Sequence, residues 1–140
     1  MSLTITRTED LETCLKLRFE VFVDEQGVPA EIERDAHDDE AIHLLALKDG
    51  EPLGTARILA KGETGKIGRV CVVKKARGTG LGKALIEAAL DEMRADGRFT
   101  RAALGSQTYA IPFYEKLGFA VYGAEFDDAG IPHRMMDRAL

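Results

Sequence analysis

The sequence predicts an α/β protein in which one mixed, mostly antiparallel, twisted sheet carries helices on both faces. The first observation is the hydrophobic pattern, which switches between strand and helix periodicity in the order β-α-β-β-β-α-β-α-β-β. The second is Asp49-Gly50, which separates two apolar runs and is a strong signal for a tight hairpin. Consecutive strands interrupted by helices fit a single mixed sheet covered on both sides. At 140 residues the chain has the size of one domain, residues 1–140.

Each element follows from its own pattern. The first helix begins after a short strand and places five residues near one face: Leu11, Cys14, Leu15, Arg18 and Phe22. A polar, acidic loop separates it from the hairpin, and a long helix is expected to end near Gly97. The expected strands are residues 2–6, 42–48, 53–60, 66–73, 100–105, 119–125 and 133–138, and the expected helices are 8–24, 79–95 and 109–117.

Composition limits the function classes. A formal net charge of −5 argues against nucleic acid as the main partner. No apolar run approaches the roughly 20 residues of a membrane span, and no signal peptide is recognisable, so we expect a cytoplasmic protein without membrane contact. Cys14 and Cys71 are expected to be reduced and structural. Three scattered histidines predict no metal site.

The stretch from Lys66 to Ala84 is the most informative part of the chain. An apolar run that ends at Val73 predicts a buried strand, and a glycine-rich turn leads from it into the long helix. Such a turn directs free backbone N–H groups and the positive end of the helix dipole at one point, which suits a diphosphate. Glycine lets a phosphate approach the backbone closely. The candidate anion-binding residues are Arg77, Gly78, Thr79, Gly80, Leu81 and Gly82.

Two nucleotide-binding motifs do not fit this turn. A Walker A loop needs glycine where Arg77 stands and a hydroxyl where Ala84 stands. In a dinucleotide fingerprint the third glycine comes one residue later than Gly82. The segment Arg77–Gly82 instead resembles the R/Q-x-x-G-x-G/A pyrophosphate loop of the GNAT family of N-acetyltransferases. A plain glycine-softened connection between strand and helix is the alternative.

A second segment carries the same resemblance. Residues 107–119, QTYAIPFYEKLGF, are similar to the A-x-x-F-Y-E-K-x-G-F block of this family, at the separation from the glycine loop that the family shows. In local terms the segment predicts a short helix that ends at Gly118. The opening helix, residues 17–26, resembles a bacterial branch of small members without an assigned substrate. The resemblance covers nearly the whole chain and implies a GNAT-like fold.

The resemblance also implies a reaction. Family members transfer an acetyl group from acetyl-CoA to an amine of a small molecule or peptide, without a metal, and the resemblance allows a homodimer. It assigns the diphosphate to residues 77–82, the pantetheine arm and the thioester carbonyl to the backbone of Val70, Cys71 and Val72, and a further coenzyme contact to Gln107. It makes Tyr114 the general acid that protonates the leaving thiolate.

The general base is not identified by the sequence. Many relatives that act on peptide amines carry a glutamate in register with Ala102, which cannot accept a proton. The candidates are Glu25, Asp35 and His43, and Arg57 could face the acceptor or pair with a carboxylate. The acidic run at residues 35–40 reads as a solvated loop, or as a device that steers a cationic amine.

Two other function classes remain open at this stage. A non-catalytic sensor of acyl-CoA is compatible with the missing glutamate at Ala102, although Tyr114 argues against it. A transferase that takes its acyl group from a carrier protein is faintly suggested by Arg18, Phe22 and Glu25.

Overall fold

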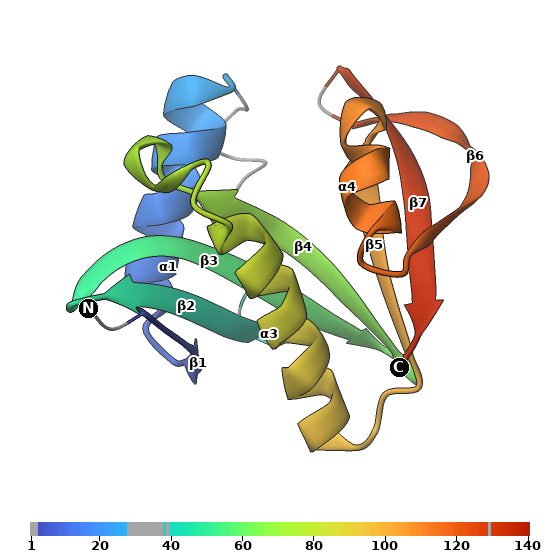
Figure 1. Cartoon of the computed structure of the whole chain (residues 1–140), viewed down its shortest axis with the longest axis horizontal. Helices are drawn as coiled ribbons and strands as arrows, with labels where there is room; N and C mark the ends of the chain where they lie inside the picture. Colours follow the sequence, from blue (N-terminus) through green and yellow to red (C-terminus); the bar gives the residue numbers. More distant parts are fainter. Residues whose placement is uncertain (1–2, 28–37, 39, 129) are drawn as a thin grey trace.

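A computed structural model describes residues 3–27, 38, 40–128 and 130–140. Within this part of the chain, seven strands form one sheet in the order β1-β2-β3-β4-β5-β7-β6 (Figure 1). All neighbouring strands pair antiparallel except β4 and β5, which are parallel. The predicted fold class and element order are confirmed. The strands are β1 (Leu3–Thr8), β2 (Ile42–Lys48), β3 (Glu51–Lys61), β4 (Thr64–Val72), β5 (Arg101–Gln107), β6 (Ala120–Asp128) and β7 (Ile131–Ala139).

The first predicted helix is two structures joined end to end. The α-helix α1 (Leu11–Arg18) begins after Asp10, whose side chain accepts a hydrogen bond from the Thr13 amide. This cap explains why the helix begins later than residue 8. The chain then continues as a π-helix, η1 (Phe19–Glu25), for which the sequence carries no recognisable signal.

The remaining helices follow the predicted positions closely. The long helix α3 (Leu81–Asp96) ends at Gly97, and a 3₁₀ turn, η2 (Lys74–Ala76), precedes it. The segment predicted as one helix over 109–117 is a 3₁₀ turn, η3 (Thr108–Ala110), followed by the short α-helix α4 (Ile111–Glu115). Gly118 ends this segment with φ 92°, and its N–H donates to the Glu115 carbonyl at 3.0 Å.

Strands β4 and β5 separate along their length. They pair in register only from Thr64 opposite Arg101 to Ile67 opposite Leu104, and Figure 1 shows them diverging from there like the arms of a V. β4 carries an irregularity at this point: Arg69 has φ 52°, and the register with β3 shifts between Thr55 and Arg57. A bulge bends a strand and increases its twist, which directs β4 away from β5.

The core lies on both faces of the sheet. Helix α1 covers one face and α3 covers the other (Figure 1). Gly65 on β4 lies against the Met93 side chain of α3, so a larger residue there would collide with it. Both cysteine side chains are buried in the core and form no disulfide, and burial raises the pKa of the Cys14 thiol. The predicted structural role of the cysteines agrees with this burial.

Candidate active site

The space between the diverging strands β4 and β5 is a cleft of about 350 Å³. We call it the splay cleft. Val70 of β4, Gln107 at the end of β5 and Tyr114 of α4 all line it, so three predicted site residues from distant parts of the sequence meet there. Strand β7 closes one side, since Gln107 lies opposite His133 in the β5–β7 register. The cleft therefore has walls from both halves of the sheet.

The glycine loop forms a second hollow, of about 310 Å³, at the N-terminus of α3. Gly80 is the N-cap of α3 and has φ 84°, a left-handed conformation that costs any other residue energy. No side chain caps this helix, and its first backbone bond runs from Ala84 N to Gly80 O at 3.0 Å. The N–H groups of residues 81–83 thus have no intrahelical acceptor and can bind an anion. The hollow is lined by Val72, Ala76, Arg77, Gly78, Gly80, Leu81, Gly82, Lys83 and Phe113.

The strand residues assigned to the coenzyme face different surroundings. Val70 lines the splay cleft and Val72 lines the hollow at the glycine loop, so β4 connects the two. The Cys71 side chain between them is buried in the core. Thr79 also turns away from the loop hollow: its hydroxyl donates to the Ala76 carbonyl, and it lines a different depression.

Arg77 is held by protein groups. Its Nε donates to the Val72 carbonyl at 3.1 Å, and its two terminal nitrogens lie 3.0 and 2.8 Å from the two carboxylate oxygens of Glu25. This fork ties the last residue of η1 to the glycine loop. The same contact occupies Glu25, which was one of the general-base candidates.

Tyr114 lies at the inner wall of the splay cleft. Its ring packs edge-on against Phe113 and Phe119, with centroids 5.0 and 6.2 Å away. Burial raises the pKa of its phenol, and the nearby Tyr109 raises it further. The hydroxyl is therefore protonated through the neutral range, which is the state that a proton donor requires.

The acidic run does not behave as a wholly solvated loop. Asp38 is only 3% exposed and accepts hydrogen bonds from Arg18 at 2.8 Å and from Arg57 at 3.0 Å. The reading of this segment as a solvated loop is therefore wrong for Asp38. Of the rest of the run, Glu40 is exposed, and residues 35–37 and 39 lie outside the described residues.

The other base candidates are not brought into the cleft. His43 is buried on β2, with Nε2 2.8 Å from the Asp38 carbonyl, and it is absent from the cleft lining. Asp35 lies outside the described residues. Ala102 is fully buried opposite Gly65, deep in the sheet. Arg57 does line the cleft, while Asp38 binds one of its nitrogens.

His133 is a cleft residue that the sequence analysis missed. It lies on β7, is 9% exposed and lines the splay cleft beside Phe126, whose ring centroid is 5.7 Å away. Its Nδ1 lies 2.8 Å from the Ile131 carbonyl. The sequence predicted a strand that begins at residue 133. It could not show that His133 lies opposite Gln107, because that position depends on the β5–β7 register.

The charged side chains in the described lining of the splay cleft are mainly basic. Arg57, Lys66 and Arg69 contribute cations, and Asp128 contributes the carboxylate. The pKa of Lys66 is lowered by burial and then by the neighbouring charges of Lys61 and Arg57. The positive charges of Lys61 and Arg57 disfavour a further positive charge on Lys66, which is why they lower its pKa.

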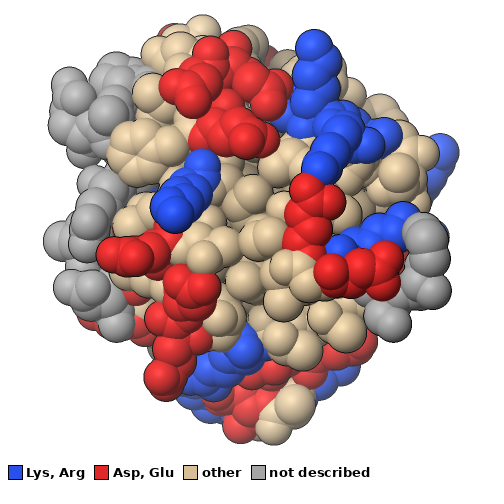
Figure 2. All heavy atoms as spheres, turned by 90° about the vertical axis from the view of Figure 1, so that its left-hand side faces the viewer, with Lys and Arg blue, Asp and Glu red and all other residues tan. Residues whose placement is uncertain are grey.

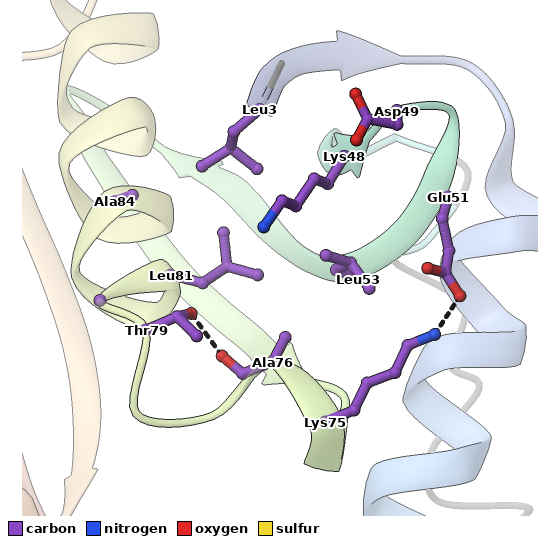
Figure 3. A pocket seen from close by; sticks show the side chains of 11 residues that line it. Leu3, Lys48, Asp49, Glu51, Leu53, Lys75, Ala76, Thr79, Leu81 and Ala84 are labelled. Carbon is purple, nitrogen blue, oxygen red and sulfur yellow. Dashed lines mark hydrogen bonds and ion pairs between the residues drawn. The ribbon is translucent and has the colours of Figure 1, made fainter. Parts of the chain in front are cut away.

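A further hollow, of about 620 Å³, lies beside the glycine loop (Figure 3). Leu3, Leu53 and Leu81 converge on it, and Lys48 extends across it. Lys75 and Glu51 on its rim are paired with each other. It shares Ala76, Gly80 and Leu81 with the hollow at the glycine loop. The splay-cleft residues Val70, Gln107 and Tyr114 do not line it.

Charge and metal-binding groups add two observations. On the face seen in Figure 2, acidic and basic side chains are interspersed with uncharged surface and form no basic stripe. In the part of the chain that the structure describes, no three His, Cys, Asp or Glu side chains gather as a metal site would require.

No helix among the described residues is both long and apolar enough to cross a bilayer.

Comparison with known proteins identifies the family. Residues 6–140 match the family model of the acetyltransferase (GNAT) domain, so the chain belongs to the GNAT family. It is similar to the uncharacterized N-acetyltransferase YjcF of Bacillus subtilis, with 43% identity over 129 residues, 91% of this chain and 91% of that protein.

Solved structures agree with this assignment. An acyl-CoA N-acyltransferase from Pseudomonas aeruginosa superposes with a TM-score of 0.87 at 34% identity, covering 99% of both chains. Escherichia coli ElaA superposes with a TM-score of 0.85 at 29% identity, covering 98% of both.

Proposed function

We propose that this protein is an acetyl-CoA-dependent N-acyltransferase that acetylates an amine of a small molecule or peptide. The observation that supports this most is that strand β4 lines two separate spaces, one at each of two nearby residues. The hollow at the glycine loop suits a diphosphate, and the splay cleft suits a thioester arm. Val72 and Val70 line one each, so a single extended ligand can follow the strand from the first space into the second.

The coenzyme is bound mainly by backbone groups in this proposal. The unbonded N–H groups at the start of α3 hold the diphosphate, with the helix dipole adding to them. The pantetheine arm lies beside residues 70–72 of β4, where β5 has diverged. A β4 N–H polarises the thioester carbonyl, and a donor of this kind is worth roughly 3–4 kcal/mol in other acyl transfers. Gln107 contacts the arm from the opposite wall.

The chemical step joins the amine nitrogen to the carbonyl carbon and breaks the bond from that carbon to sulfur. The lone pair of the neutral amine attacks, and the tetrahedral adduct collapses with expulsion of the thiolate. Tyr114 donates its hydroxyl proton to the sulfur, and the adduct nitrogen releases the proton that restores the phenol. The raised pKa of Tyr114 keeps that proton available at neutral pH.

An enzyme that consumes acetyl-CoA needs a compartment that supplies this co-substrate, so we place the protein in the cytoplasm.

The test of activity is a thiol-release assay with acetyl-CoA and a panel of amines, polyamines and peptides. Turnover with at least one amine, confirmed by the mass of its acetylated product, is the expected result. Coenzyme binding in the micromolar range without turnover on any acceptor would indicate an acyl-CoA sensor instead.

A further inference from the structure

We propose that His133 is the general base that removes a proton from the acceptor amine. This inference rests on the proposed function, because an alkylamine is protonated at neutral pH and has no lone pair to attack with. The family resemblance assigns a proton donor, Tyr114, and leaves the proton acceptor unassigned. His133 lines the same cleft as Tyr114, from the facing strand β7.

The hydrogen bond at Nδ1 determines which nitrogen can act. The Ile131 carbonyl oxygen, 2.8 Å from Nδ1, can only accept a hydrogen bond, so Nδ1 must carry a proton. In the neutral ring the lone pair is then on Nε2. None of the hydrogen bonds among the described residues uses Nε2, so that nitrogen is available to a ligand.

The ring is also fixed in place. It is 91% withdrawn from solvent and tilts by 30° against the Phe126 ring. A base whose other ring nitrogen is held by a hydrogen bond, and whose ring packs on a neighbour, needs no reorganisation when the substrate arrives. The constellation of an oriented imidazole with one free nitrogen is the common form of a general base in proteins.

The alternatives within the cleft are poorer proton acceptors. Arg57, Lys66 and Arg69 line it as cations, and Tyr109 and Tyr114 are phenols. Asp128 is the carboxylate among the described lining residues, and it lies at the exposed end of β6. Glu25 is engaged by Arg77, and it is not part of the lining. The charged side chains that line the cleft with His133 thus come from β3 (Arg57), β4 (Lys66 and Arg69) and β6 (Asp128).

The proton balance is complete with two groups. His133 Nε2 takes the first proton from the ammonium and passes it to solvent. The free amine attacks, and its second proton is lost from the tetrahedral adduct while Tyr114 protonates the sulfur. The products are an amide, a thiol and one proton released to water, so both side chains return to their starting states.

The first test reads the tautomer without any substrate. Long-range ¹H–¹⁵N NMR of the imidazoles distinguishes the two neutral tautomers and the charged ring, and the His133→Asn spectrum assigns the His133 signals. In the neutral form of the ring, we expect the proton on Nδ1. A proton on Nε2, with Nδ1 bare, overturns the proposal.

The second test compares two acceptors in His133→Asn, whose side-chain amide can still donate to the Ile131 carbonyl. With an alkylamine, kcat/KM should fall roughly 10²-fold, within the usual range for a general base. With hydroxylamine, which is already neutral at pH 7.5, the loss should stay within about threefold. Phe126→Leu, which removes the packing and keeps the base, is the control and should affect both acceptors alike.

The outcomes separate this inference from the proposed function. An equal loss with both acceptors means that His133 is structural, and an unchanged rate with the alkylamine means that it is not the base. Either result refutes the inference and leaves an active acetyltransferase. No turnover of any amine by the wild-type protein refutes the proposed function, and the role of His133 with it.

Discussion

Gly80 and Gly82 lie two residues apart in the glycine loop, yet the structure predicts opposite results for the same substitution. Gly80 has φ 84° and caps α3, whereas Gly82 lies within the first turn of that helix. A Cβ at either position meets nothing within 4 Å, so the difference comes from the backbone conformation alone. The difference in backbone conformation also explains why the family pattern R/Q-x-x-G-x-G/A requires glycine at the position of Gly80 and accepts alanine at the position of Gly82.

Gly80→Ala should destabilise the protein and weaken coenzyme binding. A left-handed alanine costs about 1–2 kcal/mol, which lowers Tm by a few degrees in a domain of this size. If the loop relaxes to relieve that strain, the N–H groups of the first turn of α3 no longer converge on the diphosphate. We therefore expect at least a tenfold loss of coenzyme A affinity, equivalent to about 1.4 kcal/mol. Gly80→Val, with its branched side chain, should lose as much or more.

Gly82→Ala is the matched control. Replacing glycine by alanine inside a helix contributes up to about 1 kcal/mol, so Tm should rise slightly. Coenzyme A affinity should stay within about threefold of wild type, while the bulkier Gly82→Val should weaken it at least tenfold. Thermal unfolding and isothermal calorimetry measure the two quantities separately. If Gly80→Ala is folded and binds coenzyme A with undiminished affinity, the diphosphate site has been assigned wrongly.

Three further substitutions probe other parts of the account. Tyr114→Phe should keep coenzyme affinity and lower kcat by roughly 10²-fold. Since the pKa of Tyr114 is raised, its ionisation should cause no loss of wild-type activity through the neutral range. A rate within threefold of wild type would make Tyr114 a packing residue. Arg18→Ala leaves a buried carboxylate short of one partner and should lower the free energy of unfolding by about 3–5 kcal/mol in urea titrations, against at most about 0.5 kcal/mol for the exposed Arg7→Ala. Arg77→Ala should weaken coenzyme A binding only about threefold at physiological salt, because Glu25 already offsets its charge; a loss as large as that in Gly80→Ala would show a direct phosphate contact.

Local patterns were enough to predict most of the fold. The Asp49-Gly50 hairpin, the glycine-rich entry to α3 and the turn at Gly118 after α4 each depend on a few neighbouring residues, and each was found where expected. The π-helix after α1 and the positive φ of Arg69 were not predictable in this way. Neither has a recognisable signal in the neighbouring residues.

The site was predictable only where a motif carried it. Tyr114 and the glycine loop belong to recognisable segments; Tyr114 lines the splay cleft, and the glycine loop lines the hollow at the start of α3. The Arg77–Glu25 fork joins residues 52 positions apart in the sequence, and His133 meets Gln107 through the β5–β7 register. Contacts of this kind depend on strand order, which no local spacing reveals.

The central claim is that the coenzyme follows β4 from the glycine loop into the splay cleft. Backbone amide chemical shifts, recorded while the ¹⁵N-labelled protein is titrated with acetyl-CoA, test it most directly. We predict the largest changes at residues 78–82, 70–72 and 107. Changes concentrated instead around Leu3, Lys48 and Asp49, which line the larger hollow in Figure 3, would contradict the account.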